Sequence, residues 1–484
     1  MDALTTVFFE PVRRCAVAAP LVVSADTPCS AVVERMAAGG AESALVVDAD
    51  RRPVGIVTER DVTRRIAFKL EREAPVRQAM TSPVRTVRED EPLYRAIARA
   101  RRLGLRRLPV VDGKGRVAGT LDVDAALDGA LAPRAELIDR IGRENSVADL
   151  AQAKAAQAEL AAGLLEERLP ATAVQALLSR MNLDVHRRLT AFMLEAMAQD
   201  GWGDPPVSFS VIVMGSGGRG ESFLAPDQDN GFVLADYPDA EHSYVDRFYS
   251  ELAGRLTGSL ARVGFPLCRG HVMATNPVWR KTLSQWQRQI ELWVTRGSDR
   301  AILNADICFD FRPAAGNTEL VDALRARVLG LVAERQSFLR DMCLALVNQK
   351  VALGFFGRFA TEEAGDGRRI NLKLRGMIPL VGAVRLLALR EGVAETSTLD
   401  RLAALRGHGV LREEECASGE AAYANLSELL MRQQVADLRA GRAAGNLVST
   451  TGLPRARRER LAESLRAVEA LQQRVREDFT SQIL

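Results

Sequence analysis

Short apolar stretches alternate with amphipathic stretches along the first 130 residues, whereas helical periodicity dominates most of the remaining chain. Residues 21–24 and 84–87 are predicted to form short strands. Each is followed by an amphipathic helix, a strand that ends in Val-Val-Asp, a turn, another strand and another helix. The pattern therefore predicts a β-α-β-β-α unit that occurs twice.

The two units are related by a constant offset, which is 64 residues from Asp26 to Asp90. Proline, glycine and valine positions recur at the same spacing: Pro28 and Pro92, Gly40 and Gly104, Val46 and Val110, and Gly55 and Gly119. Agreement at so many positions indicates an internal repeat.

The segment GIVTERD at residues 55–61 is the most specific part of the repeat. Residues 17–130 resemble the tandem CBS-domain pair. This resemblance implies that Thr58 and Asp61 hold the ribose hydroxyls of an adenosine nucleotide, and a hydroxyl beside a carboxylate suits that role. Asp122 and Ala125 occupy the matching positions of the second copy, so the resemblance supports only one such site. Alternatively, Thr58 caps the helix that follows it.

A helical stretch at 132–200 is followed by a break at 201–206 and then by an apolar strand at 207–214. GSGGRGE at 215–221 and DQDN at 227–230 come next. A dinucleotide-binding crossover is excluded, because only eleven residues separate Gly220 from Phe232 and a crossover needs about a dozen or more. A calcium loop needs Asp or Asn at its fifth position and Gly at its sixth. Counted from Asp227, these positions hold Gly231 and Phe232, so a calcium loop is excluded.

This arrangement resembles the nucleotidyltransferase superfamily: an apolar strand, Gly-Ser, a gap of ten residues and Asp-x-Asp entering a strand. Asp227 and Asp229 point the same way on a strand, so they can hold divalent cations against a triphosphate, and paired metals are expected. The turn at Gly215 and Ser216 would hold the phosphates. Arg219 would bind the leaving pyrophosphate or, alternatively, form a salt bridge with Glu221.

The resemblance also implies a third carboxylate on a later strand. Residues 306–312 are the candidate strand, with Asp306, Cys308 and Asp310 on one face. We choose Asp310 as the third catalytic and metal-binding carboxylate, with Asp306 in reserve. The alternative is a surface aspartate paired with Arg312.

Residues 135–475 resemble, at family level, the nucleotidyltransferase domain found beside CBS pairs, which is related to the uridylyl-transferring domain of protein-PII uridylyltransferase. Ser222 and Pro226 depart from this family, where Gln and Thr are expected. The helical region after residue 319 resembles the family's substrate-binding domain, with Asn371 and Lys373 as candidate contacts or, alternatively, solvated side chains. His271, near the same cleft, is equally interpretable as structural or functional.

Composition narrows the function further. The chain has 484 residues, 47% hydrophobic and 26% charged, with a formal charge of +3. This near-neutral balance gives no reason to expect a nucleic-acid or anionic-membrane partner. The sequence has no run of about 18 or more uncharged apolar residues, so no spanning helix is expected. Six scattered cysteines without a CxxC motif favour a reducing cytoplasm.

The predicted fold class is α/β plus all-α. The predicted parts are an N-terminal extension (1–16), a tandem CBS pair (17–130), a helical connector (131–200), a nucleotidyltransferase-like α/β domain (201–318) and a C-terminal helical domain (319–484). The expected function is CBS-regulated, Mg²⁺-dependent transfer of a nucleoside monophosphate from a nucleoside triphosphate to a hydroxyl, on a signalling protein. The CBS resemblance implies a homodimer. The alternatives are a non-catalytic adenosine-nucleotide sensor and a small-molecule nucleotidyltransferase.

Overall fold

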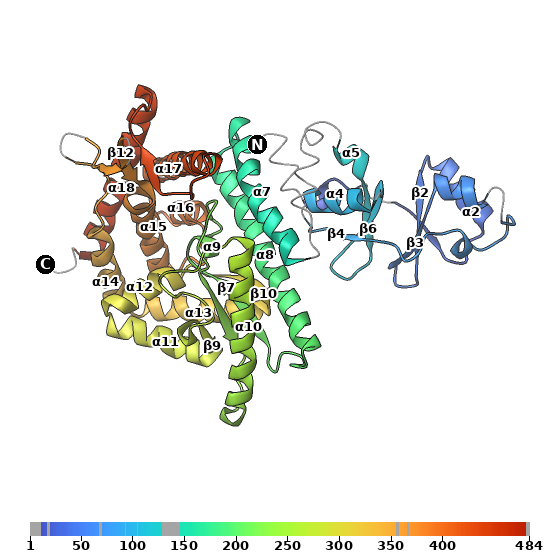
Figure 1. Cartoon of the computed structure of the whole chain (residues 1–484), viewed down its shortest axis with the longest axis horizontal. Helices are drawn as coiled ribbons and strands as arrows, with labels where there is room; N and C mark the ends of the chain where they lie inside the picture. Colours follow the sequence, from blue (N-terminus) through green and yellow to red (C-terminus); the bar gives the residue numbers. More distant parts are fainter. Residues whose placement is uncertain are drawn as a thin grey trace. The chain divides into compact units, whose positions relative to one another are not determined.

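A computed structural model describes residues 11–16, 20–66, 70–91, 93–103, 105–127, 146–354, 358–364 and 367–480 (Figure 1). The chain forms two compact units, residues 1–156 and 157–484, which are described separately. Among the described residues, no helix combines the length and apolar character needed to cross a bilayer.

The first unit contains two small mixed sheets with the same topology. Their strand orders are β1-β2-β3 and β4-β5-β6, and in each the first pair is parallel and the second antiparallel. This confirms the predicted fold of the repeat. The elements of the first copy are β1 (Leu21–Ser24), α2 (Cys29–Ala38), β2 (Ser43–Val47), β3 (Pro53–Thr58) and α3 (Glu59–Asp61). Those of the second copy are β4 (Val87–Arg88), α4 (Leu93–Arg102), β5 (Arg107–Val111), β6 (Val117–Asp122) and α5 (Val123–Leu127).

The first strand of the second copy is shorter than predicted. We expected a strand at 84–87, but only Val87 and Arg88 pair with β5. Residues 84–86 therefore contribute no pairs to the sheet.

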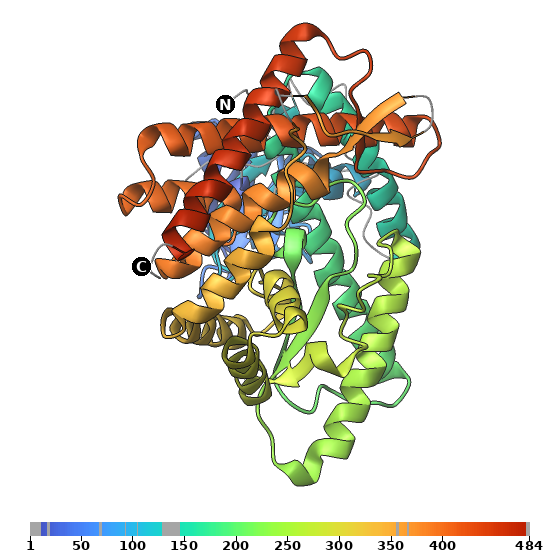
Figure 2. The ribbon, with the colours of Figure 1, turned by 90° about the vertical axis from the view of Figure 1, so that its left-hand side faces the viewer.

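A four-stranded sheet of order β10-β7-β8-β9 lies at the centre of the second unit (Figure 2). Its strands are β7 (Phe209–Val213), β8 (Asn230–Leu234), β9 (Arg280–Thr282) and β10 (Arg312–Gly316). Every residue of β7 and β8 is buried, as the apolar runs in the sequence predict. Strands β7 and β8 are antiparallel neighbours. The glycine-rich turn follows β7, and the chain returns to the sheet at β8.

Six helices accompany this sheet. They are α7 (Val147–Glu166), α8 (Ala171–Gln199), α10 (His242–Val263), α11 (Leu283–Arg296), α12 (Asp299–Cys308) and α13 (Thr318–Ala333). Helix α8 contacts β10 and α10, and α13 contacts β7 and β10. The sheet core includes the mutually packed rings of Phe209, Phe232 and Tyr249.

The predicted strand at 306–312 is wrong. Ser298 caps α12 by accepting a hydrogen bond from Ala301 N, and α12 continues to Cys308. Its buried residues Ala301, Ile302, Ala305 and Cys308 recur every three or four positions, which is a helical period. The strand begins only at Arg312. Asp306 therefore lies in a helix and Asp310 in the connection after it.

The C-terminal region is mainly helical, as expected, but it also contains a small sheet that the sequence did not indicate. Helix α18 packs on α14, α15 and α17, which makes these helices one bundle (Figure 2). The helices are α14 (Gln336–Val347), α15 (Ile378–Arg390), α16 (Thr398–Gly407), α17 (Glu413–Arg439) and α18 (Arg455–Thr480). The strands are β11 (Glu362–Ala364), β12 (Gly367–Asn371) and β13 (Leu447–Ser449), in that order.

Candidate active site

The glycine-rich turn leads directly from β7 into the short helix α9 (Gly215–Arg219). Gly215 has φ of 57°, a left-handed conformation that favours glycine. A Cβ atom there would lie 3.0 Å from Asp229 Oδ2. The absence of a side chain at Gly215 thus lets the Asp229 carboxylate approach the turn closely.

The residue between the two aspartates fixes their direction. Gln228 is fully buried, and its Nε2 donates to the carbonyl oxygens of Thr257 at 3.2 Å and Phe265 at 2.9 Å. Asp227 and Asp229 both line a pocket of about 20 Å³ that Ser216 also lines. The structure therefore brings together four of the predicted residues, because Gly215 adjoins Asp229.

Helix α8 forms another wall of this pocket, although the sequence analysis assigned it to a connector. Ser179, Asn182 and His186 line the pocket, and Ser179 Oγ accepts a hydrogen bond of 2.7 Å from Ser222 N. These residues and Gln175 recur at spacings of three and four along one buried face of the helix. That buried polar stripe is the signal from which α8 could have been predicted as part of the site.

The pocket concentrates negative charge. Burial raises the pKa of Asp229, and the neighbouring charge of Asp227 raises it further, although a hydrogen bond from Cys268 and the charges of Lys373 and Arg219 oppose the shift. Burial, followed by the charge of Asp229, raises the pKa of Cys268 to about 11. The Cys268 thiol therefore stays protonated at neutral pH and can donate to Asp229. It was not among the predicted site residues.

Two adjacent carboxylates fit a hard divalent cation such as Mg²⁺, because oxygen atoms are its preferred ligands and its charge would relieve the repulsion between them. The described part of the chain contains no group of three or more His, Cys, Asp or Glu arranged to hold a metal.

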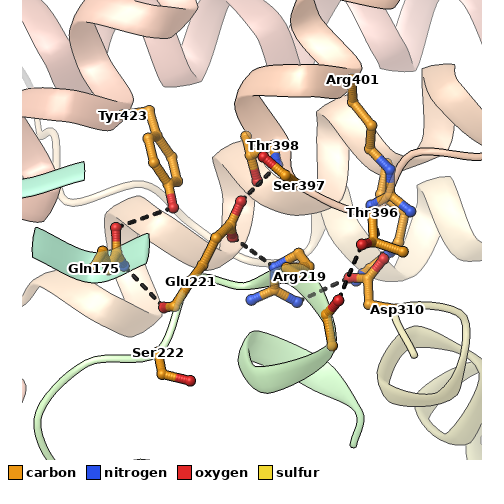
Figure 3. A network of polar contacts seen from close by, with 12 residues as sticks. Gln175, Arg219, Glu221, Ser222, Asp310, Thr396, Ser397, Thr398, Arg401 and Tyr423 are labelled. Carbon is orange, nitrogen blue, oxygen red and sulfur yellow. Dashed lines mark hydrogen bonds and ion pairs between the residues drawn. The ribbon is translucent and has the colours of Figure 1, made fainter. Parts of the chain in front are cut away.

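Asp310 lies outside this pocket, and the prediction that it is the third metal ligand is not supported. Its side chain is fully buried after α12. Its Oδ2 accepts a hydrogen bond of 2.8 Å from Arg219 (Figure 3). The same oxygen accepts a hydrogen bond of 2.8 Å from Arg385, and Oδ1 forms an ion pair of 2.7 Å with Arg401. Arginines occupy both oxygens, so the carboxylate is not available to a metal. The alternative prediction, a surface Asp310 paired with Arg312, is also not what the structure shows, because Asp310 is buried and pairs with other arginines.

Arg219 adopts the salt-bridge alternative. Its Nε donates to Glu221 Oε2 at 2.7 Å and its Nη1 donates to Asp310 (Figure 3). Arg219 thus connects two buried carboxylates, and neither of them lines the pocket of Asp227 and Asp229.

The reserve residue Asp306 pairs with Arg385 and does not line the pocket either. His271 is exposed, with φ of 54°. Asn371 Oδ1 accepts from Leu374 N at 3.1 Å, which is a local turn interaction. Lys373 is half-buried, and its charge lowers the pKa of Asp229, so it is the C-terminal candidate whose position bears on the site.

Thr58 and Asp61 of the first CBS copy bind each other. Asp61 N donates to Thr58 Oγ1 at 3.4 Å and Thr58 N donates to Asp61 Oδ2 at 3.0 Å, which forms a capping box, and Thr58 Oγ1 also donates to Asp61 Oδ2 at 2.8 Å. The helix-cap alternative is therefore present in the structure. In the second copy Asp122 accepts a hydrogen bond of 3.0 Å from Ala125 N and pairs with Arg107.

Four regions of the chain match three known protein families. Residues 12–68 and 76–129 match the CBS domain. Residues 155–300 match the family described as putative nucleotidyltransferase DUF294, and residues 336–479 match its putative nucleotidyltransferase substrate binding domain. The first of these two matches includes α8.

Individual relatives cover smaller parts of the chain. An uncharacterized protein of Methanopyrus kandleri is 33% identical over 110 residues, which are 22% of this chain and 56% of the relative. Inosine-5'-monophosphate dehydrogenase of Mycobacterium tuberculosis is 38% identical over 79 residues, 16% of this chain and 14% of that enzyme. The chain therefore spans little more than half the length of the first of these relatives, and far less of the second.

A solved CBS domain protein from Pyrobaculum aerophilum, complexed with AMP, is 26% identical to this chain. The similarity covers 25% of this chain and 93% of that protein, with a TM-score of 0.24.

Proposed function

We propose that this chain, which combines a CBS pair with a DUF294 nucleotidyltransferase domain and its substrate-binding domain, transfers a nucleoside monophosphate from a nucleoside triphosphate to a hydroxyl acceptor. The observation that carries this proposal is the juxtaposition of Asp227 and Asp229 in one pocket beside the turn at Gly215 and Ser216. The reaction forms a bond between the acceptor oxygen and the α-phosphorus and breaks the bond to the leaving pyrophosphate.

The residues of the pocket have separate roles in this proposal. Asp227 and Asp229 would hold a divalent cation, which when bound neutralises charge on the phosphates. The backbone of Gly215 and Ser216 would bind phosphate oxygens without interference from a Cβ at Gly215. A pocket of about 20 Å³ holds an ion or a water molecule, so the nucleotide itself would lie at its mouth.

The C-terminal region would select the acceptor. Lys373 comes from this region, and its charge reaches Asp229, which supports an acceptor bound on the same side. By resemblance to protein-PII uridylyltransferase, we propose a hydroxyl such as a tyrosine on a signalling protein as the acceptor, and uridylyl transfer as the first activity to test.

The CBS pair would regulate the transfer by binding an adenosine nucleotide at Thr58 and Asp61. Because these side chains already bind each other, the nucleotide must replace their hydrogen bonds. Titration calorimetry with AMP tests this: Thr58→Ala should weaken binding, whereas Thr63→Ala, which removes an exposed hydroxyl bonded to Glu59 O, should not. Equal affinity in both variants would contradict the assignment. We further propose that the CBS pairs of two chains form a homodimer.

The decisive experiment measures pyrophosphate release from each of the four nucleoside triphosphates with Mg²⁺ and a cell extract as the source of acceptor. We compare the wild-type chain with Asp229→Asn and with Asp239→Asn, a control at an exposed aspartate. Release by the wild type and the control, but not by Asp229→Asn, would support the transferase. Fractionating the extract into protein and small molecules would distinguish a protein acceptor from a small-molecule acceptor.

One observation favours a second candidate function, a non-catalytic nucleotide sensor. The described residues assemble two carboxylates at the site, and the expected third, Asp310, is neutralised by arginines. Under this alternative, the wild-type chain binds nucleoside triphosphate but releases no pyrophosphate with any acceptor fraction.

A further inference from the structure

The segment that follows the glycine-rich turn is held by parts of the chain far away in sequence. From α8, Gln175 Nε2 donates to Glu221 O at 2.9 Å, and Ser179 Oγ accepts from Ser222 N. From α17, Gln434 Oε1 accepts a hydrogen bond of 3.1 Å from Leu224 N. The backbone after the turn is therefore held on more than one side by side chains.

Glu221 lies at the centre of these contacts (Figure 3). Its side chain is buried, with only 8% exposed. Its Oε2 accepts from Arg219 Nε, and its Oε1 accepts a hydrogen bond of 2.5 Å from Thr398 N at the start of α16. Tyr423 of α17 donates to Gln175 at 3.2 Å and so joins α17 to α8 next to Glu221. A buried carboxylate of this kind needs all of its partners, because losing one leaves a charge poorly compensated.

Asp310 provides the second connection. It bridges Arg219 of α9 to Arg385 of α15 and Arg401 of α16. Thr396 Oγ1, just before α16, also donates to Gly218 O at 3.0 Å. A Cβ at Gly218 would lie 1.9 Å from the carbonyl oxygen of Asp310, so the two backbones are in direct contact.

We infer that Arg219 and Glu221 are positioning residues that fix the glycine-rich turn to the C-terminal helices, and that Arg219 does not bind pyrophosphate. The C-terminal region would therefore have two tasks, binding the acceptor and holding the phosphate-binding turn in its working conformation. Holding the turn does not depend on the proposed function. Only the expected loss of catalysis when the turn is released rests on it. The holding contacts join residues of this chain only.

The chemistry of arginine supports this assignment. A planar guanidinium donates in two directions at once, so Arg219 can bind Glu221 through Nε and Asp310 through Nη1. Glu221 is buried, and a phosphate that took Arg219 would leave this carboxylate without its arginine partner. A lysine keeps the charge that a phosphate needs but cannot reproduce the two-directional contact.

Amide hydrogen exchange of the full chain without nucleotide tests the holding contacts. In Glu221→Gln and in Arg219→Lys, we expect peptides covering residues 215–224 to exchange about tenfold faster or more, since a charged contact to a buried group is lost. Tyr423→Phe, which removes a single hydroxyl, should show a smaller increase and guards against loss of the whole fold. Glu251→Gln and Tyr244→Phe are matched controls at exposed positions and should not change these peptides.

Steady-state kinetics then distinguish positioning from phosphate binding. A misplaced turn should lower kcat by about 10²-fold in both Glu221→Gln and Arg219→Lys. If Arg219 binds phosphate instead, Arg219→Lys should change kcat little and should change mainly the KM for nucleotide. That result would overturn the inference. Unchanged exchange in Glu221→Gln would also overturn it. Faster exchange in a chain that shows no transfer activity would leave the inference standing and refute only the proposed function.

Discussion

Asp229 and Asp310 were both predicted to bind metal, yet they lie in opposite electrostatic surroundings. Asp229 shares its pocket with Asp227, and burial and that second negative charge raise its pKa. The arginine whose charge also reaches Asp229, Arg219, is paired with Glu221 and Asp310 instead. Asp310 is fully buried and contacts three arginines. Burial and negative charge prevail at Asp229, whereas three arginines surround Asp310.

The difference shows that residue type alone does not define a metal ligand. A carboxylate attracts a cation when nearby groups leave its charge uncompensated, and it becomes a structural anchor when arginines surround it. Asp227 and Asp229 therefore remain the proposed metal ligands, while Asp310 is better described as the centre of an ion-pair network. Substitutions at the two positions should have opposite effects on stability.

The largest effect is expected for Asp310→Asn. Removing this charge leaves the buried Arg401 without a carboxylate partner and Arg385 with Asp306 alone, and breaking a buried ion pair in this way costs about 3–5 kcal/mol. Urea unfolding followed by circular dichroism measures the loss. An Asp310→Asn chain as stable as the wild type would show that the network contributes nothing.

Asp229→Asn should abolish activity without destabilising the fold. Loss of a metal ligand that contributes several kcal/mol to the transition state predicts a decrease in kcat of about 10³-fold. Because the folded state raises the pKa of Asp229, the wild-type chain loses stability relative to the variant as the pH rises through that pKa.

Thermal unfolding in EDTA checks this sign. Asp229→Asn should melt above the wild type at pH 7, and the difference should disappear below about pH 3, where the carboxylate is protonated in both the folded and the unfolded state. Added Mg²⁺ should raise the melting temperature of the wild type alone. A variant that is less stable at pH 7 would contradict the picture of uncompensated charge.

The parts of the molecule that depend on local pattern could be predicted from the sequence. The repeat placed both CBS copies correctly, and the apolar run before the glycine-rich turn is strand β7. Asp227 and Asp229, which the sequence predicts to act together, do line one pocket, although both lie just before strand β8 and not in a strand as predicted.

The parts of the molecule that depend on contacts with distant residues could not be predicted from the sequence. Alternating polar and apolar residues at 306–312 fit a strand equally well, but the cap at Ser298 and the buried face of α12 favour a helix. The partners of Asp310 come from positions 219, 385 and 401, and no local pattern joins them. A sequence shows that an aspartate is present but not which charges the fold brings to it.

Gly215→Ala tests how closely Asp229 must approach the turn. The left-handed φ of 57° costs an alanine about 1–2 kcal/mol, and the new Cβ would lie 3.0 Å from Asp229 Oδ2. We expect lower stability and weaker nucleotide binding. Gly392→Ala is a matched control, because it has φ of 67° and nothing within 4 Å of its Cβ. If both variants lose the same stability and bind nucleotide equally well, contact with Asp229 is not important.

The smallest effect is expected at Cys268, which donates a hydrogen bond to Asp229 from a thiol whose pKa is raised to about 11. Cys268→Ala removes that donor and adds no charge. A hydrogen bond to a charged group contributes about 1.5–3 kcal/mol, and a thiol is a weaker donor, so we expect kcat to fall about three- to tenfold. Cys268→Ser keeps a donor and should retain most of the activity, whereas equal losses in both variants would indicate a packing role.

Because the thiol stays protonated, iodoacetamide should modify Cys268 slowly at pH 7, and rapid alkylation would show that its charge environment differs from the one that holds Asp229.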